Sequence, residues 1–317
     1  MNYTTLDRAY QLFLLDRKTF CADRTCKYYE ENIEKFLEYA KSKEVVYVNQ
    51  IDTLLLSGYI MELRSRYRFE GHPVLEGVTT HRPLKNTSIR AYGRAVKAFV
   101  NFCKENCDLD MQVKFPKMPR DDSQQVVPLY QFEVDKIDEL FNDHTEYGIR
   151  NYCIFHLMLD AGFRCREVVA LRISDILFDK NCLVVNYSKS RSRVVLMASC
   201  LQYALRDYIN CYRQNANINE PVFKSIRTDD YINNNVIKQL FARLKKKTGV
   251  ERLHPHLLRH TFATSYIMGG GNLEMLRIML GHYDYNVTKN YLHLASQYKM
   301  LQADIYKLDP VFFKTGY

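Results

Sequence analysis

The sequence predicts a mainly α-helical chain of two domains, the second of which contains a small antiparallel β-sheet. Apolar residues recur at helical spacing through most of the 317 residues, a length sufficient for two domains. Residues 176–187 are rich in Val, Ile and Leu and, with residues 193–197, have the pattern of a β-hairpin. A polar, proline-bearing stretch between Lys114 and Pro128 has no apolar period, and we interpret it as the interdomain linker.

The first domain is predicted to be helical throughout. Helices are expected over residues 25–41 and 51–68, where apolar residues recur every three or four positions. The second of these ends in a basic and aromatic cluster that suits a phosphate backbone as well as a solvated helix end. Its basic members are Arg64, Arg66 and Arg68.

The segment of residues 70–85 is predicted to be a loop or a small hairpin because it carries Gly and Pro. The next helix, over residues 87–106, has Asn86 as its predicted cap. One side of this helix is apolar, and the other is basic. The basic side carries Arg90, Arg94 and Lys97.

In the second domain, helices are predicted over residues 130–142 and 149–161, the latter ending at Gly162. The turn of the hairpin is Lys189-Ser-Arg-Ser, and from Cys200 onward the chain is expected to be helical apart from connections. The sequence contains no internal repeat and no low-complexity tract.

The charge balance favours a polyanionic partner. The chain has 45 Lys and Arg against 36 Asp and Glu, which gives a net charge of +9. Nucleic acid is the usual partner of such a surplus, although many basic proteins bind none. Nine cysteines without a Cys-x-x-Cys pair indicate reduced thiols, and hence the cytoplasm. The N-terminus lacks a signal pattern, and the longest apolar stretch, around residues 153–159, is too short to span a membrane.

The stretch His254-Pro-His-Leu-Leu-Arg-His260 carries the strongest chemical signal. If Pro255 lies in the first turn of a helix, His256, Arg259 and His260 fall on one face. A second short helix, with leucines at helical spacing, then ends at Gly281 and is followed by His282 and Tyr291. This cationic, hydrogen-bonding group suits a phosphate oxyanion.

Two other readings apply to these histidines. An isolated His-x-x-Arg-His on a helix is usually a solvated face. His256 and His260 also have the spacing of zinc ligands, but no Glu follows the first histidine as it does in metalloprotease helices, and we predict no metal site.

Three pieces now stand in order: Gly162-Phe-Arg164-Cys-Arg-Glu167-Val, the hairpin Lys189, and the cluster from His256 to Tyr291. In this order and spacing the chain resembles the tyrosine recombinase (phage integrase) family, in its compact Xer-like or mobile-element form without an arm-binding domain. The family signature is an Arg in Gly-Leu-Arg-x-x-Glu-Leu, a hairpin Lys, His-x-x-Arg, Gly-His and a nucleophilic Tyr. The resemblance covers about residues 128–295, and six separated positions coincide, which makes chance a poor explanation.

The resemblance implies site-specific DNA cleavage and rejoining through a 3′-phosphotyrosyl link, with no metal, ATP or other cofactor. Tyr291 is then the nucleophile, and Arg164 and Arg259 clamp the non-bridging phosphate oxygens. His282 adds a hydrogen bond there, and His256 is the candidate for the phenol proton. We expect Glu167 and His260 to support the site rather than to react.

Lys189 is the implied acid for the departing 5′-oxygen. Arg191 and Arg193 compete with it in the same turn, but an arginine, with a pKa of about 12 or more, is a poor proton donor. Tyr283, Tyr285 and Tyr298 are alternative hydroxyls, yet only Tyr291 has the family distance from Gly281-His282.

The resemblance further implies a two-domain clamp on double-stranded DNA. Residues 1–115 form a helical core-binding (SAM-like) domain, residues 116–128 the linker and residues 129–317 the catalytic domain. Further DNA contacts are expected from Arg64, Arg66, Arg68, Arg90, Arg94, Lys97, Arg191 and Arg193.

The C-terminal tail carries Leu294, Leu301, Ile305 and Leu308 at helical spacing. In the family this segment docks on a neighbouring protomer of a tetramer that holds two duplexes; folding back on its own domain is the alternative. Accessory directionality factors and the biological task, whether integration and excision, dimer resolution or inversion, stay open. The competing functions are relaxation of DNA by a type IB topoisomerase and a non-catalytic DNA-binding accessory role.

Overall fold

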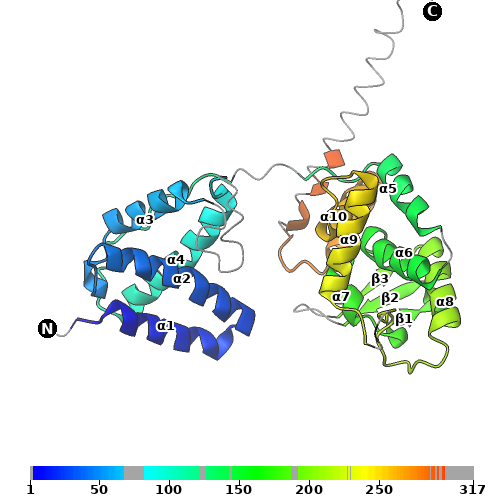
Figure 1. The fold of residues 1–317 in the computed structure, drawn as a ribbon, viewed down its shortest axis with the longest axis horizontal. Helices are drawn as coiled ribbons and strands as arrows, with labels where there is room; N and C mark the ends of the chain where they lie inside the picture. The colour runs from blue at the N-terminus through cyan, green and yellow to red at the C-terminus, as the bar shows by residue number, and fades with distance from the viewer. Residues whose placement is uncertain are drawn as a thin grey trace, which may run out of the picture. The chain divides into compact units, whose positions relative to one another are not determined.

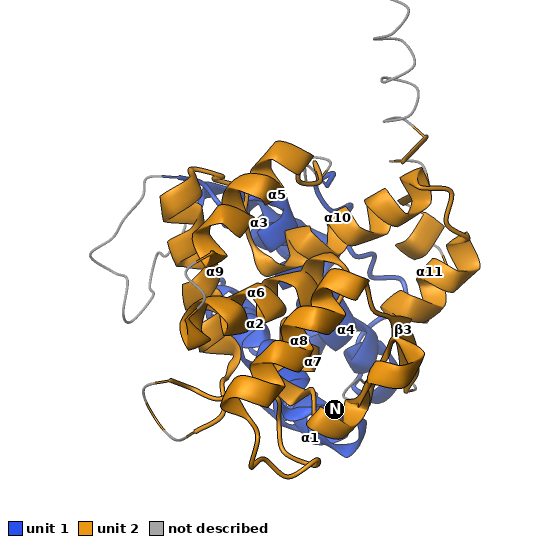
Figure 2. Cartoon of the chain, turned by 90° about the vertical axis from the view of Figure 1, so that its right-hand side faces the viewer, with its two compact units in different colours: residues 1–125 blue, residues 126–317 orange. Residues whose placement is uncertain are grey.

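The computed structural model describes residues 3–67, 82–121, 126–142, 145–186, 192–226, 228, 230–285, 287–289, 291–292 and 295–296. The chain divides into two compact units, residues 1–125 and 126–317, as Figures 1 and 2 show. The division falls inside the stretch expected to be the linker. Across the described residues, no helix has both the length and the apolar character needed to cross a membrane.

Unit 1 is built from helices. They are α1 (Leu6–Phe20), α2 (Asp23–Ser42), α3 (Thr53–Ser65) and α4 (Asn86–Asn106), with the short 3₁₀-helix η1 (Val48–Gln50) between α2 and α3. The Phe13 ring packs edge-on against Phe99 and Phe102, with ring centroids 5.6 Å and 5.5 Å apart. Each such pair adds about 0.5–1.5 kcal/mol beyond the area it buries.

Three features of unit 1 differ from the prediction. Helix α1 was not predicted, although Thr5 caps it by accepting the backbone N–H of Arg8. The predicted cap Asn86 is wrong, because Asn86 is the first helical residue and Lys85 occupies the cap position without a side-chain bond. Helix α3 ends at Ser65, earlier than predicted. Most of the predicted loop, residues 68–81, lies outside the described residues, and Arg68 lies there too.

Unit 2 combines helices with a three-stranded antiparallel sheet of order β1-β2-β3, which confirms the predicted fold class. The strands are β1 (Ile176–Leu177), β2 (Cys182–Val185) and β3 (Arg193–Leu196). The helices are α5 (Gln131–Asp138), α6 (Glu146–Leu159), α7 (Cys165–Ala170), α8 (Ser199–Tyr212), α9 (Asn234–Thr248), α10 (Pro255–Met268) and α11 (Leu273–Leu280), and η2 (Glu139–Phe141) continues α5.

The predicted hairpin is present, since β2 pairs with β3 from Cys182 opposite Leu196 to Val185 opposite Arg193. Its first arm is broken, however. Asn181, with a φ of 49°, turns the chain between β1 and β2. The turn of the hairpin, with Lys189 and Arg191, lies outside the described residues.

Helix α6 is the centre of the unit 2 core. Its second half is buried all round, and it packs against both α8 and α10. Gly162 follows it with a φ of +65°, a conformation that suits glycine. A Cβ there would lie 2.6 Å from the Phe262 ring of α10. Helix α6 therefore delivers the chain, through a turn that requires glycine, to Arg164.

Candidate functional site

Arg164 and Glu167 are held by the start of α7. Arg164 occupies the cap position, and its backbone N–H donates to Glu167 Oε2 at 2.8 Å. Its side chain returns to the same carboxylate, with Nη1 donating to Oε1 at 2.9 Å. The Arg164 side chain keeps 35% of its surface exposed, whereas that of Glu167 is buried. The local turn thus presents a guanidinium that is anchored on one side and open on the other.

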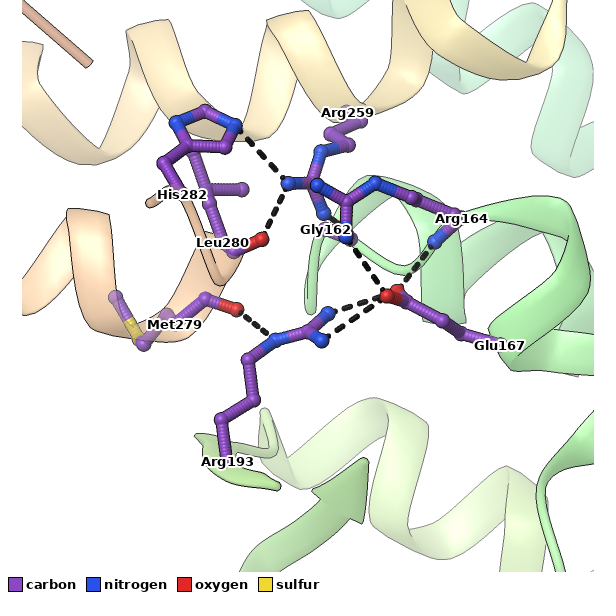
Figure 3. A network of polar contacts seen from close by, with 8 residues as sticks. All are labelled: Gly162, Arg164, Glu167, Arg193, Arg259, Met279, Leu280 and His282. Atoms are coloured by element: carbon purple, nitrogen blue, oxygen red, sulfur yellow. Dashed lines mark hydrogen bonds and ion pairs between the residues drawn. The ribbon is translucent and has the colours of Figure 1, made fainter. Parts of the chain in front are cut away.

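Arg193, the first residue of β3, completes the surroundings of Glu167. Its Nη1 and Nη2 donate to Oε1 and Oε2 at 3.0 Å and 2.7 Å. Its Nε donates to the carbonyl of Met279 at 2.6 Å (Figure 3). Because the side chain is only 3% exposed, the predicted DNA contact of Arg193 is wrong for this structure, and the residue belongs to the interior of the site.

Arg259 lies on α10, which starts with Pro255 in its first turn as predicted. The residue is buried, and its Nη1 donates to the carbonyl of Gly162 at 2.6 Å, while Nη2 donates to that of Leu280. Burial, and next the charge of Arg164, lower the pKa of Arg259. A guanidinium starts from a pKa so high that it stays charged at neutral pH.

Arg193 and Arg259 both bind the C-terminus of α11. The last carbonyls of a helix have no partner within it. Here the backbone N–H of Gly281 donates to the carbonyl of Ile278 at 3.0 Å, and that of His282 donates to the carbonyl of Arg277 at 3.1 Å. The carbonyl of Met279 accepts from Arg193, and the carbonyl of Leu280 accepts from Arg259. The positive charges of both arginines also suit the negative end of the helix.

His282 follows directly and is held between two partners. Arg259 Nη2 lies 3.1 Å from its Nε2, and Thr288 Oγ1 lies 2.9 Å from its Nδ1. A guanidinium can only donate, so Nε2 accepts and the ring proton sits on Nδ1, from which it is donated to Thr288. Burial, followed by the charge of Arg259, lowers the pKa of His282 to about 4, so the ring is neutral at pH 7.

Tyr291 lies against two of these histidines. Its ring centroid is 5.4 Å from that of His260 and 6.3 Å from that of His282, with which it is nearly parallel. The residue is only 7% exposed. Burial raises the pKa of Tyr291, while Arg259 and Arg164 oppose that shift. The phenol is therefore protonated at rest.

His256 and His260 lie on α10 beside Arg259. Burial lowers the pKa of both, with His254 as the next cause for His256 and His256 as the next cause for His260. Both rings are therefore neutral at pH 7 and able to accept a proton. Across the described residues, no group of three His, Cys, Asp or Glu side chains could hold a metal ion.

The structure thus brings together Arg164, Glu167, Arg259 and His282, which come from segments far apart in the sequence (Figure 3). The Tyr291 ring lies against that of His282. We call Arg164, Glu167, Arg193, Arg259 and His282 the arginine cluster. Lys189, Arg191 and Tyr298 lie outside the described residues. Of the alternative hydroxyls, that of Tyr283 belongs to a fully exposed side chain and that of Tyr285 to one 48% exposed, and both are separate from the cluster contacts described above.

The predicted DNA contacts of unit 1 divide into two kinds. Arg64, Arg94 and Lys97 are exposed. Arg66 is ion-paired with Glu62 at 2.7 Å, and Arg90 donates to the carbonyl of Pro119 at 3.0 Å. The first three therefore keep their charges at the surface, whereas the last two are engaged within the unit.

The sequence reasoning missed one residue of the site, Thr288, and assigned another, Arg193, to the DNA surface. Thr288 gave no signal, because a threonine six residues after a histidine fits any pattern. The inward direction of Arg193 had a signal in strand alternation: Arg193 is in phase with Val195, and both are buried while Val194 and Leu196 are exposed.

Comparison with known proteins adds independent information. Residues 129–298 match the model of the phage integrase family. The chain is 24% identical over 293 residues to the tyrosine recombinase XerC of Pelobacter propionicus, covering 91% of this chain and 90% of the relative. It is 28% identical over 216 residues to XerC of Corynebacterium glutamicum, covering 66% and 68%. The solved Tn1549 transposon integrase in complex with a circular intermediate DNA has a TM-score of 0.70 at 16% identity, covering 95% and 99% of the two chains, which is a likeness of fold.

Proposed function

Because this chain belongs to the phage integrase family of tyrosine recombinases, and is a tyrosine-type site-specific DNA recombinase, we propose that Tyr291 attacks the scissile phosphate and forms a 3′-phosphotyrosyl link. The observation that carries this proposal is the placement of the Tyr291 ring beside His282, which in turn accepts from the buried guanidinium of Arg259. Such a link conserves the energy of the phosphodiester bond, so rejoining to another 5′-hydroxyl needs neither ATP nor a metal.

The two arginines have different tasks at the phosphate. Negative charge grows on the non-bridging oxygens as the phosphorus becomes pentacoordinate. Arg164, anchored on one edge by Glu167 and open on the other, meets these oxygens from the surface side. Arg259 is fixed from within by the carbonyls of Gly162 and Leu280 and supplies positive charge without moving. A site that is preorganised in this way costs little reorganisation during the reaction.

His282 takes its part after the phosphate arrives. In the DNA-free protein its Nε2 accepts from Arg259, so it offers no proton there. A transition state with dianion-like charge beside the ring raises the pKa of His282, so Nε2 takes up a proton from the solvent and donates it in a hydrogen bond to a phosphate oxygen. Arg259 then donates to the same oxygens instead of to the ring.

The nucleophile and the leaving group each need a proton transfer. Burial raises the pKa of Tyr291, so its phenol must lose a proton to a base, and we assign that role to the neutral His256. Lys189, on the hairpin turn, is assigned as the acid for the 5′-oxygen. A lysine ammonium is a compact charge that can donate a proton, which suits this role.

DNA recombination sites are the partner, as the family implies. We propose a homotetramer on two duplexes, assembled through the apolar C-terminal tail, with accessory directionality factors as further partners. The nine thiols are free in the structure, which supports a cytoplasmic location. The relatives described above are recombinases and integrases, so they give no support to the topoisomerase or the accessory-protein alternative.

Covalent trapping tests the proposal. Wild type, Tyr291→Phe and Tyr283→Phe are incubated with a nicked suicide substrate built from the DNA that flanks the gene, in the presence of a chelator. We expect a denaturation-resistant adduct with wild type and with Tyr283→Phe, whose hydroxyl is fully exposed, and none with Tyr291→Phe. An adduct that persists in Tyr291→Phe assigns the nucleophile elsewhere. Absence of an adduct on flanking DNA and on chromosomal resolution sites favours a non-catalytic role.

A further inference from the structure

The carboxylate of Glu167 has all of its accepting capacity in use. Oε1 accepts from Arg164 Nη1 at 2.9 Å and from Arg193 Nη1 at 3.0 Å. Oε2 accepts from the Arg164 amide at 2.8 Å and from Arg193 Nη2 at 2.7 Å. A carboxylate offers about four lone-pair sites. Arg193 therefore takes half of them and leaves a single side-chain bond to Arg164.

Because Glu167 binds both Arg193 and Arg164, its carboxylate holds the Arg164 side chain less strongly than it would alone. A lone carboxylate next to an arginine forms a two-pronged, charge-assisted pair. Such a pair would turn the Arg164 fork toward Glu167 and away from a phosphate. With Arg193 in place, the negative charge of Glu167 is already balanced. Burial opposes ionisation of Glu167, yet the hydrogen bonds from Arg193 lower the pKa of that carboxyl overall.

Arg193 also acts at a second point of the site. Its Nε caps the Met279 carbonyl, one residue before the Leu280 carbonyl that holds Arg259. The Met279 bond fixes β3 against the end of α11, from which His282 follows directly (Figure 3). The buried guanidinium of Arg193 thus contacts Glu167, which holds Arg164, and the end of α11, which holds Arg259 and leads to His282.

We propose that Arg193 is a positioning residue for DNA cleavage: it saturates Glu167 so that the Arg164 guanidinium stays available to the phosphate, and it fixes the end of α11 that carries His282. This inference rests on the proposed function. Arg193 does not touch the substrate, since it is buried behind Glu167. Its effect on the reaction is therefore predicted to be on the rate of cleavage and not on DNA affinity.

The test uses full-length Arg193→Gln, Arg193→Lys, Glu167→Gln and the double variant Arg193→Gln/Glu167→Gln. Arg213 is the matched control, because it is also buried and its Nη2 lies 2.7 Å from Glu220 Oε2, with no bond to the arginine cluster. Single-turnover cleavage of the suicide substrate, DNA affinity and thermal unfolding are measured for each variant and for Arg213→Gln and Arg213→Lys.

We expect Arg193→Gln to slow cleavage by about 10- to 100-fold while DNA affinity stays within about threefold of wild type. Adding Glu167→Gln should then restore about tenfold of the rate, because the glutamine keeps its carbonyl oxygen for Arg164 but has no charge to hold it back. Glu167→Gln alone should slow the reaction. A purely structural role for Arg193 predicts the opposite, namely that the double variant is slower than the single one.

Several outcomes overturn the inference. They are cleavage by Arg193→Gln at the rate of Arg213→Gln, a double variant slower than Arg193→Gln, or a loss confined to DNA affinity. If Arg193→Gln loses its cooperative unfolding transition, Arg193→Lys is compared with Arg213→Lys, since lysine keeps the charge without the fork, and equal rates overturn the inference. If wild type itself forms no adduct, the proposed function fails, and the inference fails with it.

Discussion

The ring proton of His282 is placed by its two neighbours, and at the scale of single residues this is the most informative detail of the site. Arg259 donates to Nε2, so Nδ1 carries the proton and Thr288 accepts it. Thr288 is fully buried and lies three residues before Tyr291. One hydroxyl therefore connects His282 to the segment that carries Tyr291, the proposed nucleophile.

Thr288→Val is predicted to disturb this arrangement without changing the shape of the side chain. The Nδ1–H loses its acceptor, and the alternative ring form points an N–H at the donating Arg259. A buried donor without a partner costs about 1–3 kcal/mol, so we expect lower stability and cleavage slowed by about tenfold. Thr288→Ser, which keeps the hydroxyl, is the control.

Cleavage rates on the suicide substrate and the imidazole nitrogen shifts in NMR spectra measure the two effects. In wild type and Thr288→Ser the spectra should show the proton on Nδ1. If Thr288→Val and Thr288→Ser behave alike in both measurements, Thr288 does not set the ring form of His282.

At the scale of elements, the sequence predicted the ends of helices best where a proline or glycine lies next to apolar residues at helical spacing. Pro255 marked the start of α10, and Gly281, with a φ of 62°, marked the end of α11. Helix α1 was not predicted, although its sequence carries the same kind of signal: Leu6, Ala9, Tyr10 and Phe13 lie at helical spacing, and all are buried.

The rest of the site depended on tertiary contacts that no local pattern contains. The family motif indicated Arg164, Arg259, His282 and Tyr291, and the structure brings them together. That the carbonyls of Met279 and Leu280 hold two different arginines follows only from the packing of β3 and α10 on α11. The broken first arm of the hairpin followed likewise from a left-handed Asn181, which the run of Val, Ile and Leu around it concealed.

Helix α6 contains an ion-pair centre that predicts a pH dependence of stability. His156 is buried, with Nε2 3.0 Å from Asp138 and Nδ1 2.7 Å from Asp160. Burial opposes its charge, but the bonds to both carboxylates raise the pKa of His156 to about 9. The folded protein therefore holds this proton more tightly than the unfolded chain, whose histidine has a pKa of about 6.5. The stabilisation is complete below the latter value and is lost as the pH rises through about 9.

His156→Gln should accordingly lower the free energy of unfolding by a few kcal/mol at pH 6, an order of magnitude set by the size of the shift. The difference from wild type should shrink as the pH rises from 7 to 10. Urea unfolding at each pH measures it, and His254→Gln, at an exposed position, is the control. A gap that stays constant over this range would show that His156 is not charged in the folded protein.

At the scale of the whole molecule, the net charge of +9 favours binding to DNA with an affinity that depends on salt. Each phosphate contact releases a condensed counterion, so affinity falls steeply with salt. In the proposed mechanism, cleavage depends instead on a few preorganised groups in unit 2, several of which are buried. Affinity and cleavage rate are therefore properties of different residues, and substitutions should separate them.

Arg94→Gln/Lys97→Gln provides that separation on α4 of unit 1, where both side chains are exposed. If each contacts one phosphate, the slope of log affinity against log salt should become shallower by about two, with weaker binding to every DNA sequence. The cleavage rate of the saturated complex should stay at the wild-type value, because Arg164, Arg259 and Tyr291 are untouched. Lys41→Gln is the matched control, since its ammonium lies 2.9 Å from Asp7 and is already paired. An unchanged salt slope in the double variant would remove this face of α4 from the DNA interface, and a slower cleavage step at saturation would mean that unit 1 also shapes the chemistry.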